Sequence, residues 1–408
     1  MRVALFAAVA LLATAAPADA QLRALGDADA GPALLGGQVV VGHARAGQLS
    51  VTAGDAVALG SIPMGRDDEA WLDASGEQVA ALVGSRLWVS GPGGFSLLAD
   101  RVGEPPVSTW VRPLQLAGGG VVTLEDDRRA VLRSAGGSRE LALPPGADPA
   151  LVATAGGLGV AATLDGALVV FDLGNDSEVR QIALGRYDAS TINGLAISPA
   201  GDVAATVPVG DGDDVLLWAP AGADRVRVLA RGREYSAVAT AGGHVAWVGG
   251  DGLRDGVRVF VIDAASRRIT FKGPPAFEIG SLSFDGSSLA FRTSACVVAG
   301  PATASRRTLP EGPCVRTEVG VAPEAPAGGR YLARVACINA AERSCRVVAR
   351  VRVGKRVVAR GRARVPRGSA RVLALKLDAR GRDARPSRLR LSVTVSDPDG
   401  RSRVAYEE

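Results

Sequence analysis

The chain has little of what most enzymes use for acid–base or covalent chemistry. Its 408 residues include two histidines and four cysteines, and aromatic residues make up 4% of the total. It contains no GxSxG, P-loop, HExxH or CxxC pattern. His43 and His244 lie far from any cysteine in sequence and lack candidate partners, so we expect neither a catalytic triad nor a metal site. No cofactor is expected, and the absences leave the identity of the ligand open.

Long apolar runs are also missing after the first 20 residues. Residues 1–20 combine Arg2, an apolar stretch and a small-x-small site before Gln21, which is typical of a Sec-type secretory signal. The alternative is a first buried strand or helix. No later stretch holds 18 uninterrupted apolar residues, so we expect no transmembrane segment. The protein is therefore expected to be secreted or associated with the cell envelope.

Four cysteines in an exported chain indicate disulfides, and three connectivities are compatible with the sequence. We favour Cys296–Cys314 and Cys337–Cys345, because each pair lies within one local stretch of strands and turns. Zinc ligation is the competing interpretation.

A repeat of about 42 residues organises most of the chain. Small residues, often Gly, precede apolar runs whose anchors are separated by 40, 42, 39, 43, 42 and 44 residues. This period is the length of one four-stranded propeller blade, and strand signals bounded by Gly, Asp and Pro support it. The sequence therefore predicts an all-β fold with a seven-bladed β-propeller over residues 21–318, in which residues 22–25 supply an outer strand to the last blade. The anchors are Val39, Val79, Val121, Val160, Val203, Val245 and Leu289.

Two of the repeats carry a recognisable turn. Residues 197–204 (ISPAGDVA) and 282–291 (LSFDGSSLAF) resemble the SPDGxxLAF turn of bacterial TolB-like and WD40-like β-propellers. The Gly-His and Trp-Asp signatures of WD40 repeats themselves are missing. The resemblance implies a propeller and no catalytic residue, and TolB-like relatives imply an assembly partner in a periplasm-like compartment.

The 42-residue period ends before residue 319. Two Pro and a Gly pair in residues 319–329 predict a linker, although a first strand that contains Pro is the alternative. Strict alternation over residues 330–408 predicts a small Arg-rich β-sandwich of the immunoglobulin-like or fibronectin-like type. This segment also resembles Arg-rich β-sandwich modules at the C-termini of exported actinobacterial proteins.

Positive charge is concentrated in that last segment. From Arg316 onward there are 22 Lys+Arg against 9 Asp+Glu, whereas the whole chain has a formal net charge of +5. A solvated strand face explains the outward Arg rows, and an anionic cell-envelope polymer or lipid surface as partner is the alternative. Nucleic acid is not expected, because no aromatic residues interleave with the arginines to stack on bases.

Charged and aromatic residues recur in the loops that lead into the first strand of each repeat. In a propeller these loops gather around the mouth of the central channel, where such side chains suit sugar or peptide recognition. Charged solvent-exposed loops with no ligand are the alternative interpretation. The candidate ligand-binding residues are Arg66, Asp68, Glu104, Trp110, Tyr187, Asp188, Arg233, Tyr235 and Glu278.

These observations favour an exported, non-enzymatic binding or scaffold protein, with an unknown extracellular protein or glycan as its partner. The alternative is a propeller glycoside hydrolase or lyase acting on extracellular glycans, which would need two carboxylates about 5–10 Å apart in one pocket.

Overall fold

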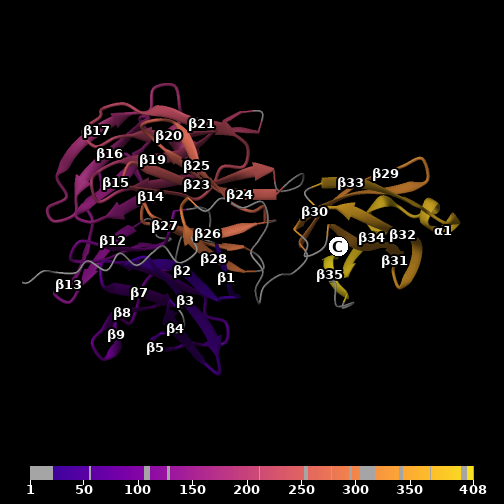
Figure 1. The fold of residues 1–408 in the computed structure, drawn as a ribbon, viewed down its shortest axis with the longest axis horizontal. Coiled ribbons are helices and arrows are strands. Elements are labelled where there is room, and N and C mark those ends of the chain that lie inside the picture. Colours follow the sequence, from indigo (N-terminus) through magenta and orange to yellow (C-terminus); the bar gives the residue numbers. More distant parts are fainter. Residues whose placement is uncertain are drawn as a thin grey trace, which may run out of the picture.

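Most of the described chain is folded into β-strands, as the computed structural model shows (Figure 1). Alternating apolar and polar residues between Gly- and Asp-containing turns favour strands over helices. In the described part of the chain the one α-helix is α1 (Ala379–Asp383), and η1 (Ala189–Thr191) and η2 (Pro386–Arg388) are short 3-10 turns. None of these helices has the length or the hydrophobicity needed to cross a bilayer. The structure describes residues 22–54, 57–104, 111–125, 129–210, 212–251, 256–276, 278–293, 296–303, 318–339, 343–367, 369–396 and 402–407.

Within the described residues, seven four-stranded antiparallel sheets make up the larger part of the fold, which confirms the expected propeller-like all-β fold. In six sheets four consecutive strands pair in chain order, and in the seventh β1 joins β26–β28. The first four sheets contain β2 (Ala30–Leu35), β3 (Gln38–Arg45), β4 (Gln48–Ala53), β5 (Val57–Pro63); β6 (Ala70–Ser75), β7 (Gln78–Val83), β8 (Arg86–Gly91), β9 (Gly94–Ala99); β10 (Leu114–Ala117), β11 (Gly120–Glu125), β12 (Arg129–Ser134), β13 (Gly137–Glu140); β14 (Ala147–Ala155), β15 (Leu158–Thr163), β16 (Ala167–Asp172) and β17 (Glu178–Ala183).

The remaining three sheets follow the same plan. They contain β18 (Gly194–Ile197), β19 (Val203–Gly210), β20 (Asp213–Ala219), β21 (Arg227–Gly232); β22 (Val238–Ala241), β23 (His244–Asp251), β24 (Gly256–Asp263), β25 (Arg268–Lys272); β26 (Ile279–Phe284), β27 (Ser288–Thr293), β28 (Val297–Pro301) and β1 (Arg23–Gly26).

The start of the chain closes the last sheet. β1 pairs with β28 in antiparallel register, with Arg23 opposite Ala299 and Ala24 opposite Val298. The expectation that residues 22–25 supply the outer strand of that sheet is therefore confirmed. This pairing joins the two ends of the repeat array, so the first and last sheets need no separate element to cover an exposed edge.

The first strands of the seven sheets face a common axis. Each first strand contacts that of the next sheet, in the order β2, β6, β10, β14, β18, β22 and β26, and β26 contacts β2 again. At one such approach, between β18 and the residues before β22, a Cβ on Gly194 would lie 2.4 Å from the Ser236 carbonyl oxygen. Only a glycine allows this separation of the two backbones.

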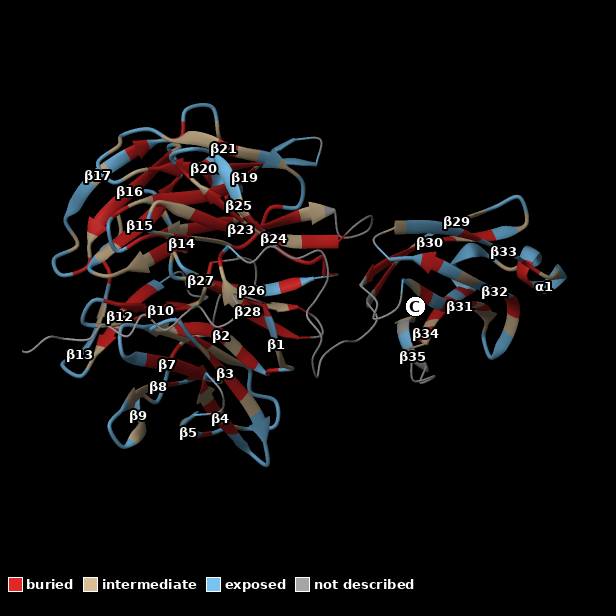
Figure 2. Cartoon of the chain, viewed as in Figure 1, coloured by how far each residue is buried: buried red, intermediate tan, exposed pale blue. Residues whose placement is uncertain are grey.

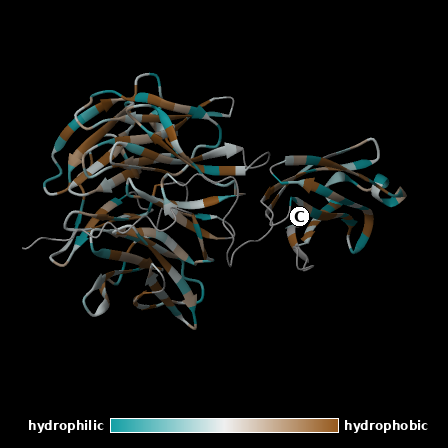
Figure 3. Ribbon diagram, in the orientation of Figure 1, coloured by the Kyte–Doolittle hydropathy of each residue, from teal (hydrophilic) through white to brown (hydrophobic). Residues whose placement is uncertain are grey.

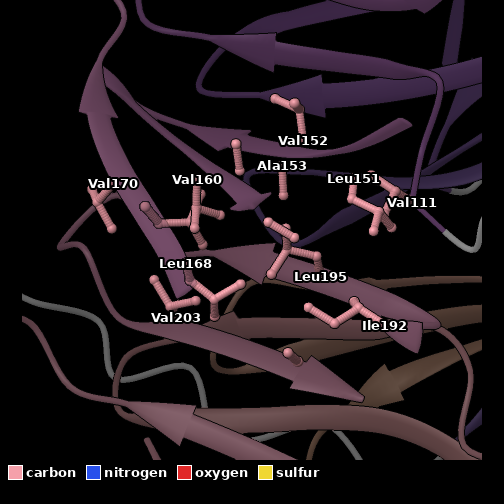
Figure 4. Close-up of a cluster of buried hydrophobic side chains, with 14 of the residues drawn as sticks. Val111, Leu151, Val152, Ala153, Val160, Leu168, Val170, Ile192, Leu195 and Val203 are labelled. Atoms are coloured by element: carbon pink, nitrogen blue, oxygen red, sulfur yellow. The ribbon is translucent and has the colours of Figure 1, made fainter. Parts of the chain in front are cut away.

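The hydrophobic core lies between neighbouring sheets (Figure 2). Middle strands such as β16 and β20 are buried on both faces, while outer strands such as β17 are largely exposed. Figure 3 shows the matching concentration of hydrophobic residues along the strands. In the largest cluster, Val160, Leu168 and Leu195 converge between sheets β14–β17 and β18–β21 (Figure 4). Full burial of each such side chain contributes about 1.5–3 kcal/mol.

The C-terminal part consists of two further sheets that share one hydrophobic cluster. A three-stranded sheet has the order β29-β30-β33, and a four-stranded sheet has the order β32-β31-β34-β35. Alternate residues of β31 and β34 are buried between them, as the period-2 pattern predicts. Their strands are β29 (Glu318–Ala327), β30 (Arg330–Asn339), β31 (Ser344–Val353), β32 (Arg356–Pro366), β33 (Ser369–Lys376), β34 (Leu389–Ser396) and β35 (Ser402–Glu407).

One predicted disulfide lies in this part. Cys337 of β30 and Cys345 of β31 are bonded, with Cα atoms 5.6 Å apart, and the bond joins the two sheets. Cys296 is also disulfide-bonded. Cys314 lies outside the described residues, so the pairing of Cys296 with Cys314 stays a prediction.

The structure corrects the prediction of a linker over residues 319–329. Most of it is strand β29, which pairs with β30 from Val319 opposite Cys337 to Ala327 opposite Arg330. The prediction failed because β29 is an edge strand, where the missing N–H of Pro323 or Pro326 can face away from the ladder. Proline at an edge is compatible with a strand, and the alternative interpretation of this segment was the right one.

Candidate functional site

A cavity of about 780 Å³ lies on the common axis of the seven sheets. All seven first strands contribute lining residues, together with turns that follow them. Many of these residues are small, such as Gly31, Ala74, Ala155, Ala239 and Gly280, which leaves room between the strands. A concave site of this volume, with a few fixed polar groups, is typical of ligand-binding sites.

An ion pair reaches across this cavity. Arg112, which precedes β10, donates from Nη1 to Asp73 Oδ1 on β6 at 2.9 Å, and from Nη2 to the Leu282 carbonyl oxygen on β26. The second carboxylate oxygen of Asp73 accepts from the Leu116 N–H at 2.7 Å. One guanidinium thus connects three sheets, of which β26–β28 is not a neighbour of the other two.

The acidic side chains of the cavity lining, Asp73 and Asp285, both accept hydrogen bonds. Burial raises the pKa of Asp73 above its ordinary value, and the nearby Arg112 guanidinium and the Leu116 N–H offset part of that increase. Asp285, after β26, accepts from the N–H groups of Ser287 and Ser288 at 2.8 and 2.7 Å. Asp73 cannot act as a general acid or base without breaking these contacts, whereas Asp285 is exposed and these bonds occupy only its Oδ1.

Gln115 fixes the spacing of two first strands. Its Nε2 donates to the carbonyl oxygens of Arg112 and Val152 at 2.8 and 2.9 Å, and its Oε1 accepts from the Thr154 N–H at 2.5 Å. Gln115 is 5% exposed, so its amide serves the junction between β10 and β14 rather than the open space of the cavity.

The eight described candidate residues of the loops do not line the cavity. Trp110 lies outside the described residues. The lining comes from the first strands and from turns such as those at Gly76, Gly156 and Pro199, whereas the loops before the strands supply few lining residues, among them Arg112 and Ala237. The loop candidates and the cavity are therefore distinct surfaces.

Two of the predicted loops do meet. The Arg231 guanidinium donates to the Tyr187 hydroxyl at 3.4 Å, and Arg186 lies over the Tyr187 ring at 5.5 Å from its centroid. Arg233 lies 3.7 Å from a carboxylate oxygen of Asp213, and both side chains are largely exposed. We call Arg186, Tyr187, Arg231 and Arg233 the tyrosine–arginine surface.

The candidate acids have local structural roles or are exposed. Asp188 accepts from both the hydroxyl and the N–H of Ser190, and these bonds lower its pKa. Asp68 accepts from the Gly65 N–H at 2.6 Å. Glu104 and Glu278 are exposed. A lowered pKa makes Asp188 a poor general acid.

Tyr235 belongs to the core rather than to the surface. Its side chain is buried, and its ring meets that of Trp247 edge-on at 6.0 Å, while Trp247 stacks on Phe260 at 5.1 Å. Its N–H donates to Asp214 at 2.7 Å across the junction between β20 and the loop before β22. The sequence signal at Tyr235 therefore reports packing between two sheets.

We expect Tyr235 to ionise far later than an ordinary tyrosine, because burial raises its pKa from 10.0 to about 12. The native state therefore holds this proton more tightly than the unfolded state does. The stability from the neutral phenol is intact below about pH 10 and is lost as the pH rises toward 12, a change of about 2–3 kcal/mol.

Urea unfolding between about pH 9 and pH 12 and the absorbance of tyrosinate measure both effects. Tyr235→Phe should flatten this part of the alkaline decline. An identical decline in wild type and Tyr235→Phe would show that another group causes it.

Asp73, Arg112 and Gln115 were missed in the sequence. Each is a polar or charged residue in or next to a first strand made mostly of small and apolar residues, as in Ala-Trp-Leu-Asp-Ala-Ser at 70–75 and Leu-Gln-Leu-Ala at 114–117. That departure from the strand pattern was the available signal.

No protein-family model and no curated protein sequence matches the chain. Among solved structures, the crystal structure of BamB from Moraxella catarrhalis is similar to it with a TM-score of 0.39 and 16% sequence identity. The similar region covers 67% of this chain and 84% of that one.

Proposed function

We propose that the protein is an exported, non-enzymatic binding or scaffold protein that holds its ligand at the central cavity of a seven-bladed β-propeller. The observation that supports this most directly is the cavity of about 780 Å³ lined from all seven first strands. The tyrosine–arginine surface supplies the half-buried Tyr187 ring and exposed arginines for contact with an extracellular protein or glycan.

The engaged carboxylates favour binding over hydrolysis. Glycoside hydrolysis uses one carboxyl group as an acid and a second as a base or nucleophile. In the cavity, Asp73 is held by Arg112 and Asp285 by backbone N–H groups. Preformed donors and acceptors of this kind fix a ligand's orientation without transferring protons to it.

Export and retention complete the proposal. The secretory signal, residues 1–20, lies outside the described residues, and the Cys337–Cys345 disulfide suits an oxidising compartment. The two C-terminal sheets then form a small immunoglobulin-like β-sandwich over residues 330–408, extended at its edge by β29. In this proposal the arginines of that sandwich keep the protein near an anionic polymer of the cell envelope.

Two matched glycine substitutions test the cavity. Gly280 lines it, and a Cβ at this position would have no atom closer than 3.8 Å, whereas a Cβ on Gly93, in the turn between β8 and β9, would have none within 4 Å. Gly280→Trp fills the cavity, and Gly93→Trp places the same ring on an outer turn. We expect the immobilised wild type and Gly93→Trp to retain the same extracellular protein or glycan, and Gly280→Trp to lose it.

Equal retention by all three proteins would remove the cavity from the proposal. Release of sugar from a glycan panel by the wild type, lost in Gly280→Trp, would replace the binding function with a hydrolase or lyase function.

A further inference from the structure

Two charged side chains of the central cavity have no charged partner within the described residues. Asp73 and Arg112, which also line the cavity, form the ion pair already described. The other two charged lining residues are Arg292 on β27 and Asp285 in the turn between β26 and β27, and neither forms an ion pair in the described part of the chain. A charge in a concave site without a counter-charge indicates a ligand that supplies one.

Arg292 uses one nitrogen of its guanidinium to join two sheets. Its Nη1 donates to the carbonyl oxygens of Ala28 and Asp29, at 3.4 and 3.0 Å, in the segment before β2. Among the described residues, Nε and Nη2 of Arg292 have no acceptor. These two nitrogens form one edge of the guanidinium, and their parallel N–H groups fit the two oxygens of a carboxylate.

The unused edge of Arg292 lies beside Gly280, another lining residue of the cavity. A Cβ on Gly280 would lie 3.8 Å from Nη2 and 4.0 Å from Nε of Arg292, with no other described side chain within 4 Å. Gly280 is exposed and Arg292 is half-buried. The edge is therefore open to a ligand at the end of the cavity where β26 begins.

Asp285 lies at the other end of β26. Its Oδ1 accepts from the N–H groups of Ser287 and Ser288, and its Oδ2 accepts from no described donor. Arg292 lies opposite Ser281 in the strand register. From Ser281 to Asp285 the strand covers about 14 Å at about 3.4 Å per residue. The cavity thus has a cationic group at one end and an anionic oxygen at its turn end.

The available donors favour a carboxylate over a phosphate. A phosphate monoester carries a charge of about −1.5 to −2 and three acceptor oxygens. The free edge of Arg292 supplies two donors and a single positive charge, which one carboxylate satisfies.

The charge at the turn end favours a peptide over an acidic glycan. A chain of acidic sugars carries a carboxylate on every unit, so its further carboxylates would approach Asp285. The C-terminus of a polypeptide carries one terminal carboxylate, and four extended residues span about 14 Å. Each first strand lies at the end of its sheet, so one of its edges has N–H and C=O groups that no strand pairs. A peptide backbone offers matching donors and acceptors.

We propose that the cavity binds the C-terminal segment of an extracellular polypeptide, with its terminal carboxylate on Nε and Nη2 of Arg292. The chain enters from the turn end, where Gly37, Gly76 and Asp285 are exposed. Its fourth or fifth residue from the C-terminus then lies near Asp285. This inference rests on the binding role in the proposed function and names the chemistry that the cavity recognises.

The test uses the full chain without residues 1–20 and an array of six-residue peptides. Each peptide is fixed through an N-terminal linker and is made twice, with a free C-terminal carboxylate and with a C-terminal amide. We expect the wild type to bind its best peptides at least about tenfold more tightly as acids than as amides. Equal binding of the two forms would overturn the proposal without the need for a variant.

Arg292→Gln should bind the acids as weakly as the wild type binds the amides, with its binding of the amides unchanged. Arg268→Gln, at an exposed position at the start of β25 in the neighbouring sheet, makes the same change of charge and should bind like the wild type. Circular dichroism and the urea midpoint establish that both variants are folded. An equal loss of acid and amide binding in Arg292→Gln would show that Arg292 only joins the sheets, and would overturn the proposal.

Asp285→Asn tests the direction of the bound chain and keeps an oxygen that accepts from Ser287 and Ser288. We expect Asp or Glu at the fourth or fifth position from the C-terminus to weaken binding to the wild type about two- to fivefold. Asp285→Asn should remove this penalty. The same penalty in both proteins would contradict a chain that runs from Arg292 to Asp285.

A competing ligand and the cavity variant separate this proposal from the proposed function. Tighter binding of a galacturonic acid tetramer than of any peptide, lost in Gly280→Trp, would overturn the peptide and keep the cavity as a glycan site. Peptide binding that survives Gly280→Trp would lie outside the cavity and would also overturn the proposal. If an extracellular partner is lost in Gly280→Trp but kept in Arg292→Gln, the proposed function stands and this inference fails.

Discussion

Replacing Arg112 with alanine is expected to lower the free energy of unfolding by about 3 kcal/mol at neutral pH. The guanidinium donates to Asp73 and to the Leu282 carbonyl oxygen, and the Asp73 side chain is 14% exposed. Removing the Arg112 guanidinium leaves the Asp73 carboxylate in the cavity wall. Within the described residues, its remaining donors are the N–H groups of Leu116 and Ala74. Urea unfolding of wild type and variant measures the loss.

The loss should depend on pH in a defined direction. Burial already raises the pKa of Asp73, and Arg112→Ala removes the positive charge that opposes the increase. A carboxyl group whose native pKa is raised destabilises the fold when it ionises, so the penalty is smallest in acid and grows as the pH rises through that pKa. Asp73→Asn in the Arg112→Ala background should restore part of the stability at neutral pH.

Arg101, an exposed arginine near the same sheets, provides the control. Arg101→Ala should stay within about 0.5 kcal/mol of wild type. A pH-independent loss in Arg112→Ala would show that packing of the long side chain, and not its charge, holds the three sheets together.

The 42-residue repeat allowed the fold to be predicted from the sequence, because most of the repeated sheets pair strands that are consecutive in the chain. In the described residues six of the seven repeated sheets are built from four consecutive strands, so the period near 42 residues and the Gly-rich turns are enough to locate them. The pairing of β1 with β28 is not local, and it was predictable for a different reason, since a ring of sheets must join its ends. The failure at β29 came from treating Pro323 and Pro326 as breaks, although an edge strand tolerates them.

The cavity and its ion pair were harder to predict from the sequence, because they depend on contacts between different repeats. Asp73 and Arg112 are 39 positions apart, and Leu282 lies 170 positions beyond Arg112. No local pattern states that these three residues face one cavity. Tyr187 and Arg231 could be proposed as loop residues, but their contact across 44 positions required the arrangement of the sheets.

A second large effect is expected at Glu125, at the end of β11. Its side chain is 2% exposed and accepts from Arg133 at 2.6 Å and from Arg129 at 3.2 Å, while the Thr123 hydroxyl lies 3.2 Å from it. Arg133 is itself buried. Glu125→Leu therefore leaves a buried guanidinium without its carboxylate, and we expect a loss of about 3–5 kcal/mol in the free energy of unfolding.

The double variant Glu125→Leu, Arg133→Met tests whether the unpaired guanidinium causes the loss of stability in Glu125→Leu. Removing both charges replaces the buried ion pair with apolar side chains, so the double variant should be more stable than Glu125→Leu alone. Glu140→Leu, at an exposed position of β13 in the same sheet, should change stability by no more than about 0.5 kcal/mol. If the double variant lost as much as the two single variants added together, the stability at Glu125 would come from independent contacts. The charge pair would then not be what holds this sheet, and the cost of Glu125→Leu would have to be assigned to the volume of the new side chain beside Gly103.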